Sequence, residues 1–330
     1  MSDNREGKSV LTLKNVTKRF SGLVAVNDLS LDMKERTIHA LIGPNGAGKS
    51  TAINMITGLL PLTEGEIYHE GTKISGMSAH QIAQTRCSRT FQNLKLTVKE
   101  NLMMGSMMDM KQGFFPFMFN FGAAAREEKL IQEKADSILE FIGLKDLADE
   151  YPANMPYGKQ KLTELARSLM SDPKLLFLDE PAAGLNPSER VEFVNIMLKV
   201  FDSGIDIFLI EHNMDVIMNI SDYITVISFG AKIAEGTPEE IQQDPVVIKA
   251  YLGTGISRTW QGGLHMLKVN GIDVYYGKVQ ALFDVSIEVG DNEIVSIIGA
   301  NGAGKTTFLR VLSGDLDPST GSVSYPSDMR

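Results

Sequence analysis

The chain carries the same glycine-rich pattern twice. Residues 43–51 read GPNGAGKST and residues 299–307 read GANGAGKTT, so both satisfy G-x-x-x-x-G-K-S/T. Such glycines let successive backbone N–H groups face phosphate oxygens, the lysine balances phosphate charge, and the following hydroxyl can bind Mg²⁺. Each copy follows an apolar run, at 38–42 and at 294–298, of the kind that forms a buried strand. The pattern therefore predicts a strand, a phosphate-binding loop and a helix in both places, and a site for a nucleoside triphosphate.

The residues expected to contact nucleotide fall into two groups. The first loop supplies Gly43, Asn45, Gly46, Ala47, Gly48, Lys49, Ser50 and Thr51, and the second supplies Gly299, Asn301, Gly302, Ala303, Gly304, Lys305, Thr306 and Thr307.

The duplication extends beyond the two loops. At a constant spacing of 256 positions, Phe20 aligns with Tyr276 and Gly65 aligns with Gly321. Self-similarity over this distance indicates a duplicated domain rather than a short structural repeat. The second copy stops at Arg330, whereas the first continues far past the equivalent point.

We therefore expect three parts along the chain. Residues 9–254 form a complete nucleotide-binding domain, residues 255–263 a glycine-rich linker, and residues 264–330 the opening part of a second domain. A loop-bearing strand without its neighbouring strands exposes unpaired edges, so we do not expect an ordered fold for residues 264–330.

Composition narrows the classes of function. The 330 residues allow about two domains, and the net charge of −9 disfavours nucleic acid as a partner. The single cysteine, Cys87, excludes an intrachain disulfide framework, fits a reducing compartment, and is expected to be a small buried side chain. The polar N-terminus lacks a signal peptide, and no apolar run reaches the roughly 18 residues of a transmembrane helix. These features predict a cytoplasmic protein.

The pattern of apolar residues predicts an α/β fold. Short β-like runs in residues 9–35 indicate a small antiparallel sheet, and residues 93–170 are mainly helix-forming, with apolar side chains at helical spacing over 126–141. The apolar runs 174–179 and 205–210 predict buried parallel strands joined by a helix over 188–201. A last helix is expected over 238–252.

Polar residues follow two of these predicted strands. Asp179 and Glu180 come directly after one, where open α/β sheets bind ligands, and His212 comes after the next. Asp179 is expected to hold Mg²⁺ through water, and Glu180 to orient or deprotonate the attacking water. Gln92 is expected to complete the shell of metal and water. The simpler interpretation is that Asp179 and Glu180 begin a turn and that His212 is structural.

These residues together resemble the nucleotide-binding subunits of ABC transporters. The resemblance implies that Phe20, and Tyr276 in the second copy, stack on adenine, that residues 43–51 are Walker A, and that Gln92 is the Q-loop glutamine. It also implies that residues 175–180 are Walker B and that His212 is the switch histidine. The fold implied is a P-loop NTPase (RecA-like) core with an antiparallel β subdomain and a helical subdomain, plus a partial second copy.

Details within that family point to the group that takes up branched-chain amino acids, notably residues 182–187, the Tyr157-Gly158 core and Tyr251. The function implied is ATP hydrolysis, with ATP and Mg²⁺ bound, that energises an importer. Partners implied are integral membrane permease subunits and a second ABC ATPase domain, as homo- or heterodimer, on the inner face of the cell membrane.

The family's signature sequence is altered in this chain. Pro156 stands where the family has a serine whose hydroxyl contacts the partner domain's ATP. Backbone N–H groups near Tyr157 and Gly158 can still make that contact, and Lys159 can add positive charge. We expect weaker closure over ATP as a result of the lost hydroxyl. The Met- and Phe-rich residues 102–121 are interpreted either as core of the helical subdomain or as a surface for the permease.

Two other functions stay open on the sequence alone. One is a soluble ABC protein that acts on ribosomes or DNA, although the basic extensions and charged linkers of such proteins are absent here. The other is a regulatory or degenerate subunit that binds ATP without hydrolysing it, which Pro156 and the incomplete second copy favour.

Overall fold

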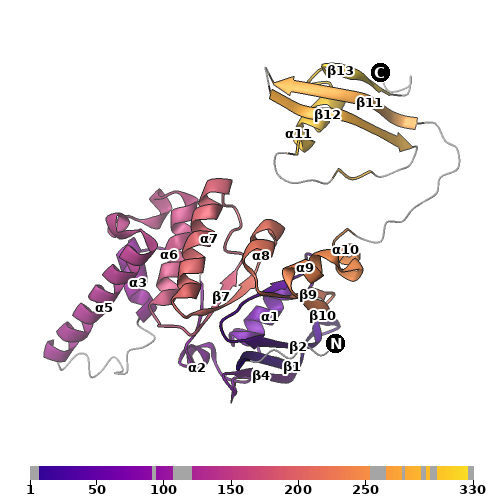
Figure 1. Ribbon diagram of the computed structural model, residues 1–330. Coiled ribbons are helices and arrows are strands. Elements are labelled where there is room, and N and C mark those ends of the chain that lie inside the picture. The colour runs from indigo at the N-terminus through magenta and orange to yellow at the C-terminus, as the bar shows by residue number, and fades with distance from the viewer. Residues whose placement is uncertain are drawn as a thin grey trace. The chain divides into compact units, whose positions relative to one another are not determined.

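The computed structural model describes residues 7–90, 94–106, 121–252, 265–276, 279–290, 295–297 and 303–325. The chain divides into two compact units, Met1–Gly255 and Ile256–Arg330 (Figure 1). None of the helices within those described ranges combines the length and the apolar character that a membrane crossing needs.

A six-stranded sheet forms the centre of the first unit, in the order β10-β9-β3-β8-β7-β6. Its strands are β3 (Ile38–Ile42), β6 (Cys87–Arg89), β7 (Leu175–Asp179), β8 (Asp206–Ile210), β9 (Tyr223–Ser228) and β10 (Ala231–Gly236). All neighbours pair in parallel except β9 and β10, which form an antiparallel hairpin. The expected parallel strands at 174–179 and 205–210 are thus confirmed as β7 and β8.

Both faces of this sheet are buried, because successive side chains of a strand point to opposite faces. Leu176 and Leu178 of β7 pack with the helices of one face, while Leu175 and Phe177 pack on the other. All five residues of β3 are buried, as expected for a strand hydrogen-bonded on both sides. This arrangement brings the carboxyl ends of β3, β7 and β8 to one edge.

A second, antiparallel sheet covers one face together with α1 (Lys49–Ile56). Its order is β2-β1-β4-β5, with β1 (Ser9–Phe20), β2 (Leu23–Lys34), β4 (Glu64–His69) and β5 (Thr72–Lys73). The short helix α2 (Ala79–Ala83) follows it along the chain. The predicted antiparallel sheet is confirmed, with longer strands than the two short apolar runs indicated.

Helices cover the other face of the central sheet (Figure 1). They are α3 (Val98–Ser106), α5 (Phe121–Ile142), α6 (Tyr157–Leu169) and α7 (Pro187–Asp202), with the 3₁₀ turns η1 (Lys145–Leu147) and η2 (Pro152–Asn154). Ala135, Leu139 and Ile142 of α5 are buried against α3 and α6. The helices expected around 126–141 and 188–201 are therefore present as α5 and α7.

The single helix expected over 238–252 is wrong. The structure has two helices there, α9 (Pro238–Gln243) and α10 (Pro245–Leu252), which follow α8 (Met214–Ile220) and the β9–β10 hairpin. Asp244 between them is extended (ψ 116°), because a residue that precedes proline avoids the helical region. Its carboxylate then caps α10 by accepting hydrogen bonds from Val246 N and Val247 N.

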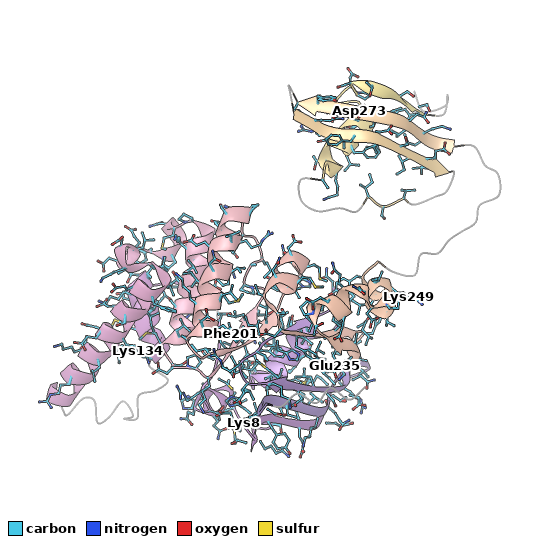
Figure 2. The ribbon with its side chains drawn as sticks, in the orientation of Figure 1. Lys8, Lys134, Phe201, Glu235, Lys249 and Asp273 are labelled. Carbon is cyan, nitrogen blue, oxygen red and sulfur yellow. The ribbon has the colours of Figure 1, made fainter. Side chains whose placement is uncertain are left out.

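The second unit contains a three-stranded antiparallel sheet in the order β12-β11-β13, with one helix. The elements are β11 (His265–Tyr276), β12 (Val279–Gly290), α11 (Lys305–Leu312) and β13 (Thr320–Ser324). Asp273 on β11 (Figure 2) joins the strands, since it accepts hydrogen bonds from Gln280 Nε2 at 2.8 Å and Thr320 Oγ1 at 2.6 Å. The expectation that residues 264–330 lack an ordered fold is wrong for this sheet and helix, which share a small core.

The predicted strand before the second glycine-rich loop is also wrong where the structure describes it. Residues 295–297 have no regular structure, and Val295 and Ile297 are 37% and 39% exposed. The equivalent strand β3 is hydrogen-bonded to β8 and β9, whereas the described residues of the second unit offer no such parallel neighbours. Strand formation at this position depends on that distant pairing.

Candidate functional site

The first glycine-rich loop connects β3 to α1 and turns tightly against its surroundings. Gly48 has φ 101°, and a Cβ atom built there would lie 2.4 Å from the carbonyl oxygen of Ala25. Only glycine fits both the conformation and the space. Helix α1 begins at Lys49, so its first N–H groups and its positive end face the loop.

Lys49 is buried within this loop. Its Nζ donates hydrogen bonds to the carbonyl oxygens of Gly43 at 2.8 Å and Pro44 at 3.0 Å. Burial lowers the pKa of the Lys49 ammonium, while the negative charges of Glu180 and Asp179 act to raise it. Both carboxylates therefore lie close enough to interact with the lysine electrostatically.

A cavity of about 470 Å³ gathers most of the predicted residues of the first unit. It is lined by Phe20, Leu23, Val24, Ala25, Asn45, Gly46, Ala47, Gly48, Lys49, Ser50, Thr51, Glu180, His212 and Phe229. An aromatic ring, the amides of the glycine-rich loop, a lysine, a carboxylate and an imidazole thus face one space. The size suits a nucleotide.

Phe20, at the end of β1, has one face covered and the rest of the ring partly exposed. The Nζ of Lys18 lies 5.0 Å from the ring centroid and also donates to the carbonyl oxygen of Pro61. The ammonium over the ring holds it by a cation–π interaction. The exposed part of the ring contributes to the wall of the cavity.

Glu180 and His212 meet at the ends of β7 and β8. The Nε2 of His212 lies 2.7 Å from Oε1 of Glu180. Glu180 has the left-handed backbone conformation (φ 49°), and its N–H donates to the carbonyl oxygen of Ile210 at 2.8 Å. A strained carboxylate residue held from two sides is typical of functional sites.

Asp179 is oriented by an arginine that the sequence analysis did not select. One guanidinium nitrogen of Arg89, the last residue of β6, donates to Oδ2 of Asp179 at 2.7 Å. Within the described ranges no three His, Cys, Asp or Glu side chains cluster as a metal cage. One carboxylate and the Ser50 hydroxyl fit a Mg²⁺ ion that arrives with phosphate oxygens and water as its other ligands.

Glu211 is a further residue that sequence reasoning missed. It is 2% exposed, and its carboxylate accepts hydrogen bonds from Ala182 N at 2.8 Å, His212 N at 2.7 Å and Asn213 N at 3.1 Å. The carboxylate thus fixes the chain after Glu180 to the chain around His212. Its position, polar and directly after an apolar strand, was the available signal.

Tyr157 and Gly158 lie apart from the nucleotide cavity. The N–H of Gly158, in the first turn of α6, donates to Oε1 of Glu189 at 3.2 Å. Pro156 is the N-cap residue of α6 and supplies no side-chain hydrogen bond. Lys159, which follows, forms an ion pair with Glu192 at 2.6 Å.

Some predicted residues lie outside the described part of the chain. These are Gln92, and in the second loop Gly299, Asn301 and Gly302. Gly304 (φ 86°) precedes α11, which starts with Lys305, Thr306 and Thr307, and Ala303 comes just before it. The Tyr276 hydroxyl hydrogen-bonds Thr307 and Arg310, which lowers its pKa.

Comparison with known proteins decides the family. A family model described as "ABC transporter" matches residues 26–183 and 282–329. A second, described as "Branched-chain amino acid ATP-binding cassette transporter", matches residues 231–256. The chain belongs to the ABC transporter family. As a member with this site, it is an ABC ATPase.

Individual relatives place this ABC ATPase in one group of the family. The high-affinity branched-chain amino acid transport ATP-binding protein BraF of Pseudomonas aeruginosa is 41% identical over 251 residues, which cover 74% of this chain and 98% of the relative. LivG of Escherichia coli, with the same description, is 39% identical over 249 residues, with 74% and 98% covered. The chain is an ATP-binding protein of this branched-chain amino acid transporter group.

Solved structures agree with the fold of the first unit. A nucleotide-free ATP-binding cassette from an ABC transporter superposes with a TM-score of 0.67 and 33% identity, covering 74% of this chain and 100% of that one. The ADP conformation of an ATP-binding cassette gives a TM-score of 0.66 at 33% identity, with 74% and 99% covered. The P-loop α/β fold with its antiparallel β subdomain is confirmed.

Proposed function

We propose that the first unit, over residues 9–254, binds ATP with Mg²⁺ and hydrolyses it to drive the import of branched-chain amino acids. The observation that carries this proposal is the single cavity shared by Phe20, the glycine-rich loop, Glu180 and His212. The substrate class follows the names of the relatives, which are branched-chain amino acid transport proteins.

Each side chain has a role that its position supports. Phe20 stacks on adenine, and Lys49 with the loop amides neutralises the phosphates. Ser50 and Asp179 would hold Mg²⁺, which would withdraw electron density from the γ-phosphate. Gln92 lies outside the described residues and is assigned to the same ion by the family resemblance. Glu180 orients the attacking water and accepts its proton, and His212 fixes the Glu180 carboxylate through the 2.7 Å contact.

Closure requires a second ATPase domain. The signature residues Tyr157 and Gly158 cover the ATP of a partner domain rather than their own, which fits their separation from the cavity. With Pro156 in place, the contact depends on backbone N–H groups, and Gly158 N must leave Glu189 to make it. Restoring a hydroxyl with Pro156→Ser is expected to strengthen ATP-dependent dimerisation; unchanged dimerisation in ultracentrifugation contradicts this role.

Residues 264–330 are, in this proposal, the opening part of a second ATPase domain. The bounds of β11, β12 and α11 each lie 256 positions after those of β1, β2 and α1, and the sheet orders match. The hydrolysis proposed here is assigned to the first unit, because its cavity contains Lys49, Glu180 and His212.

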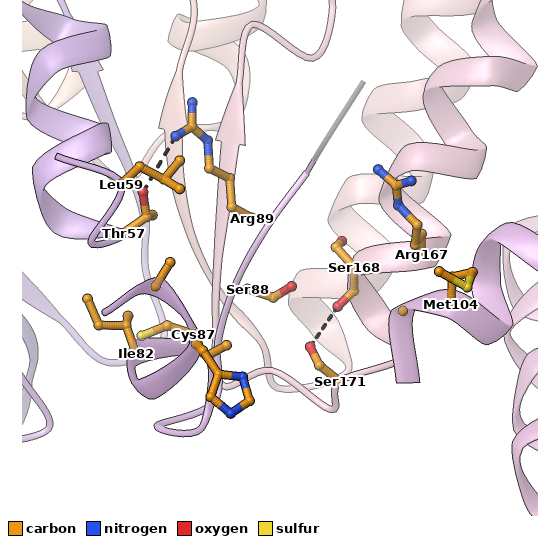
Figure 3. Close-up of a pocket in the computed structure, with 14 residues that line it drawn as sticks. Thr57, Leu59, Ile82, Cys87, Ser88, Arg89, Met104, Arg167, Ser168 and Ser171 are labelled. Atoms are coloured by element: carbon orange, nitrogen blue, oxygen red, sulfur yellow. Dashed lines mark hydrogen bonds between the residues drawn. The ribbon is translucent and has the colours of Figure 1, made fainter. Parts of the chain in front are cut away.

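A permease helix is proposed to dock in an apolar cavity of about 440 Å³ in the first unit (Figure 3). The cavity lies where the P-loop core meets the helical subdomain, lined by Leu59 and Ile82 on one side and by Met104 and Arg167 on the other. Such a partner holds the ATPase on the inner face of the cell membrane. Residues 107–120, the other candidate surface, lie outside the described residues.

Uptake of radiolabelled leucine tests the transport role. The full chain is expressed in a bacterium that lacks its own branched-chain ATP-binding protein but retains the permease subunits and binding protein. Restored uptake, absent with Lys49→Ala, supports the proposal. Normal ATPase activity of the purified chain with no uptake of any branched-chain amino acid contradicts the substrate class, and no ATPase activity favours a regulatory subunit.

A further inference from the structure

Arg89 lies between the nucleotide site and the apolar cavity of Figure 3. Its side chain, 13% exposed, starts at the end of β6 and forms part of the cavity wall with Thr57 and Leu59. Its guanidinium reaches Asp179 Oδ2 at 2.7 Å and Asn54 Oδ1, on α1, at 2.6 Å. One side chain therefore joins the carboxylate expected at Mg²⁺, the helix of the glycine-rich loop, and the cavity.

The cavity is apolar with two positive groups. Its lining includes Arg89 from the P-loop core and Arg167 from α6, and no Asp or Glu among the described residues that form it. A helix with an apolar face and one carboxylate fits this chemistry better than a purely apolar helix, because the carboxylate can pair with a guanidinium.

The Asp179 carboxylate cannot bind the Arg89 guanidinium and a metal ion equally well at the same time. Arg89 offsets its charge and orients one of its oxygens, so less of the negative charge is available to a metal ion. An anionic group in the cavity competes with Asp179 for the same guanidinium, and Arg89 can turn toward it without leaving β6. The guanidinium carries several N–H donors, so it can exchange one acceptor for another.

We propose that Arg89 is a positioning residue whose guanidinium pairs either with Asp179 or with an acidic side chain on the docked helix. Drawing Arg89 toward the cavity releases Asp179 for Mg²⁺, so docking tunes the metal site. The inference rests on the proposed function for the nature of the docked helix and for the assignment of Mg²⁺ to Asp179.

The test uses the purified full chain and a non-hydrolysable ATP analogue. Its Kd is measured in excess Mg²⁺ and in EDTA, and the ratio of the two reports the contribution of the metal. In Arg89→Met the Mg²⁺-dependent gain in affinity is expected to rise at least about fivefold. Arg89→Lys, which keeps the charge, is expected to stay near the unaltered chain. If Arg89 has only a structural role, the Kd values in Mg²⁺ and in EDTA change by the same factor, and that result overturns the proposal.

A second arm leaves Arg89 in place. Leu59→Cys is labelled with an anionic or with a neutral methanethiosulfonate of similar size. The native cysteine, Cys87, is buried but lines the same cavity, so it is replaced by serine in both labelled chains. The anionic adduct is expected to raise the Mg²⁺-dependent gain and the neutral one to leave it unchanged. Equal effects of both adducts, in a chain that still hydrolyses ATP, overturn this inference and leave the proposed function intact.

Discussion

The imidazole of His212 contacts the carboxylate of Glu180 at 2.7 Å, although the two residues follow different strands of the central sheet. The adjacent Glu211 holds both chain segments by accepting three backbone hydrogen bonds. The site therefore connects the ends of β7 and β8, and Glu180 lies close enough to Lys49 to interact with it electrostatically.

The His212–Glu180 contact is expected to matter for turnover more than for ATP binding. His212→Ala removes the group that orients Glu180, so kcat falls by about 100-fold while the affinity for ATP changes by less than about threefold. His212→Gln retains a donor for the carboxylate and is expected to lose less. Steady-state ATPase assays with fluorescent-nucleotide binding measure both values; equal losses in kcat and affinity contradict the assignment.

Glu211→Gln is expected to lower the free energy of unfolding by about 1–3 kcal/mol, because the amide NH₂ then faces buried N–H donors. Urea denaturation followed by circular dichroism measures the change. The matched control is Glu239→Gln, an exposed glutamate of α9, with an effect below about 0.5 kcal/mol. Similar midpoints for both variants contradict a structural role for the buried carboxylate.

Phe229 is an aromatic residue at a turn where its ring contacts little. It is 94% exposed and has φ 47°, a left-handed conformation that costs a bulky residue about 1–2 kcal/mol. Phe229→Asn is therefore expected to raise the free energy of unfolding by about 1 kcal/mol, since asparagine tolerates this conformation. Phe229→Ala lacks the polar side chain that lets asparagine hydrogen-bond locally in this conformation, and is expected to gain less. A loss of stability in the asparagine variant contradicts the strain.

His69 makes the first unit sensitive to acid. Its Nε2 is buried with no hydrogen-bond partner among the described residues, and burial lowers the pKa of His69 below the ordinary 6.5. Glu70 opposes this shift, whereas Lys174 and Lys8 add to it. The unfolded chain then takes up a proton at a higher pH than the folded chain, so stability is retained above about pH 6.5 and falls as the pH drops below it.

Replacing the imidazole tests that dependence. His69→Leu is expected to flatten the fall in urea midpoint between about pH 7 and pH 5, because the unfolded chain loses one proton-binding group. Carboxylates whose lowered pKa values do not depend on His69, such as Glu100 beside Thr97, contribute equally to both chains and cancel in the comparison. Identical slopes for the two proteins show that His69 does not titrate as described.

The residues close to one another in sequence were the easiest to predict. The glycine-rich loop, and Asp179 and Glu180 after an apolar strand, depend on local spacing, and the sheet then brings strand ends together by topology. The split at Asp244 also has a local cause in the sequence, because Pro245 follows it.

Contacts between segments far apart in the chain could not be predicted from the sequence. Nothing near Arg89 indicates that its guanidinium reaches Asp179, and nothing near Gly158 indicates that its N–H donates to Glu189. Residues 295–297 look like a strand but lack parallel neighbours among the described residues. In each case the local structure depends on residues that lie far away in the sequence.

ATP turnover by the full chain tests the central claim, that the first unit alone performs hydrolysis. Glu180→Gln is expected to lower kcat by about 10³-fold with ATP still bound, because the carboxylate that activates water is lost. Lys305→Ala, in the second glycine-rich loop, is expected to change kcat by less than about twofold. Full activity in Glu180→Gln, or loss of activity in Lys305→Ala, would contradict the account.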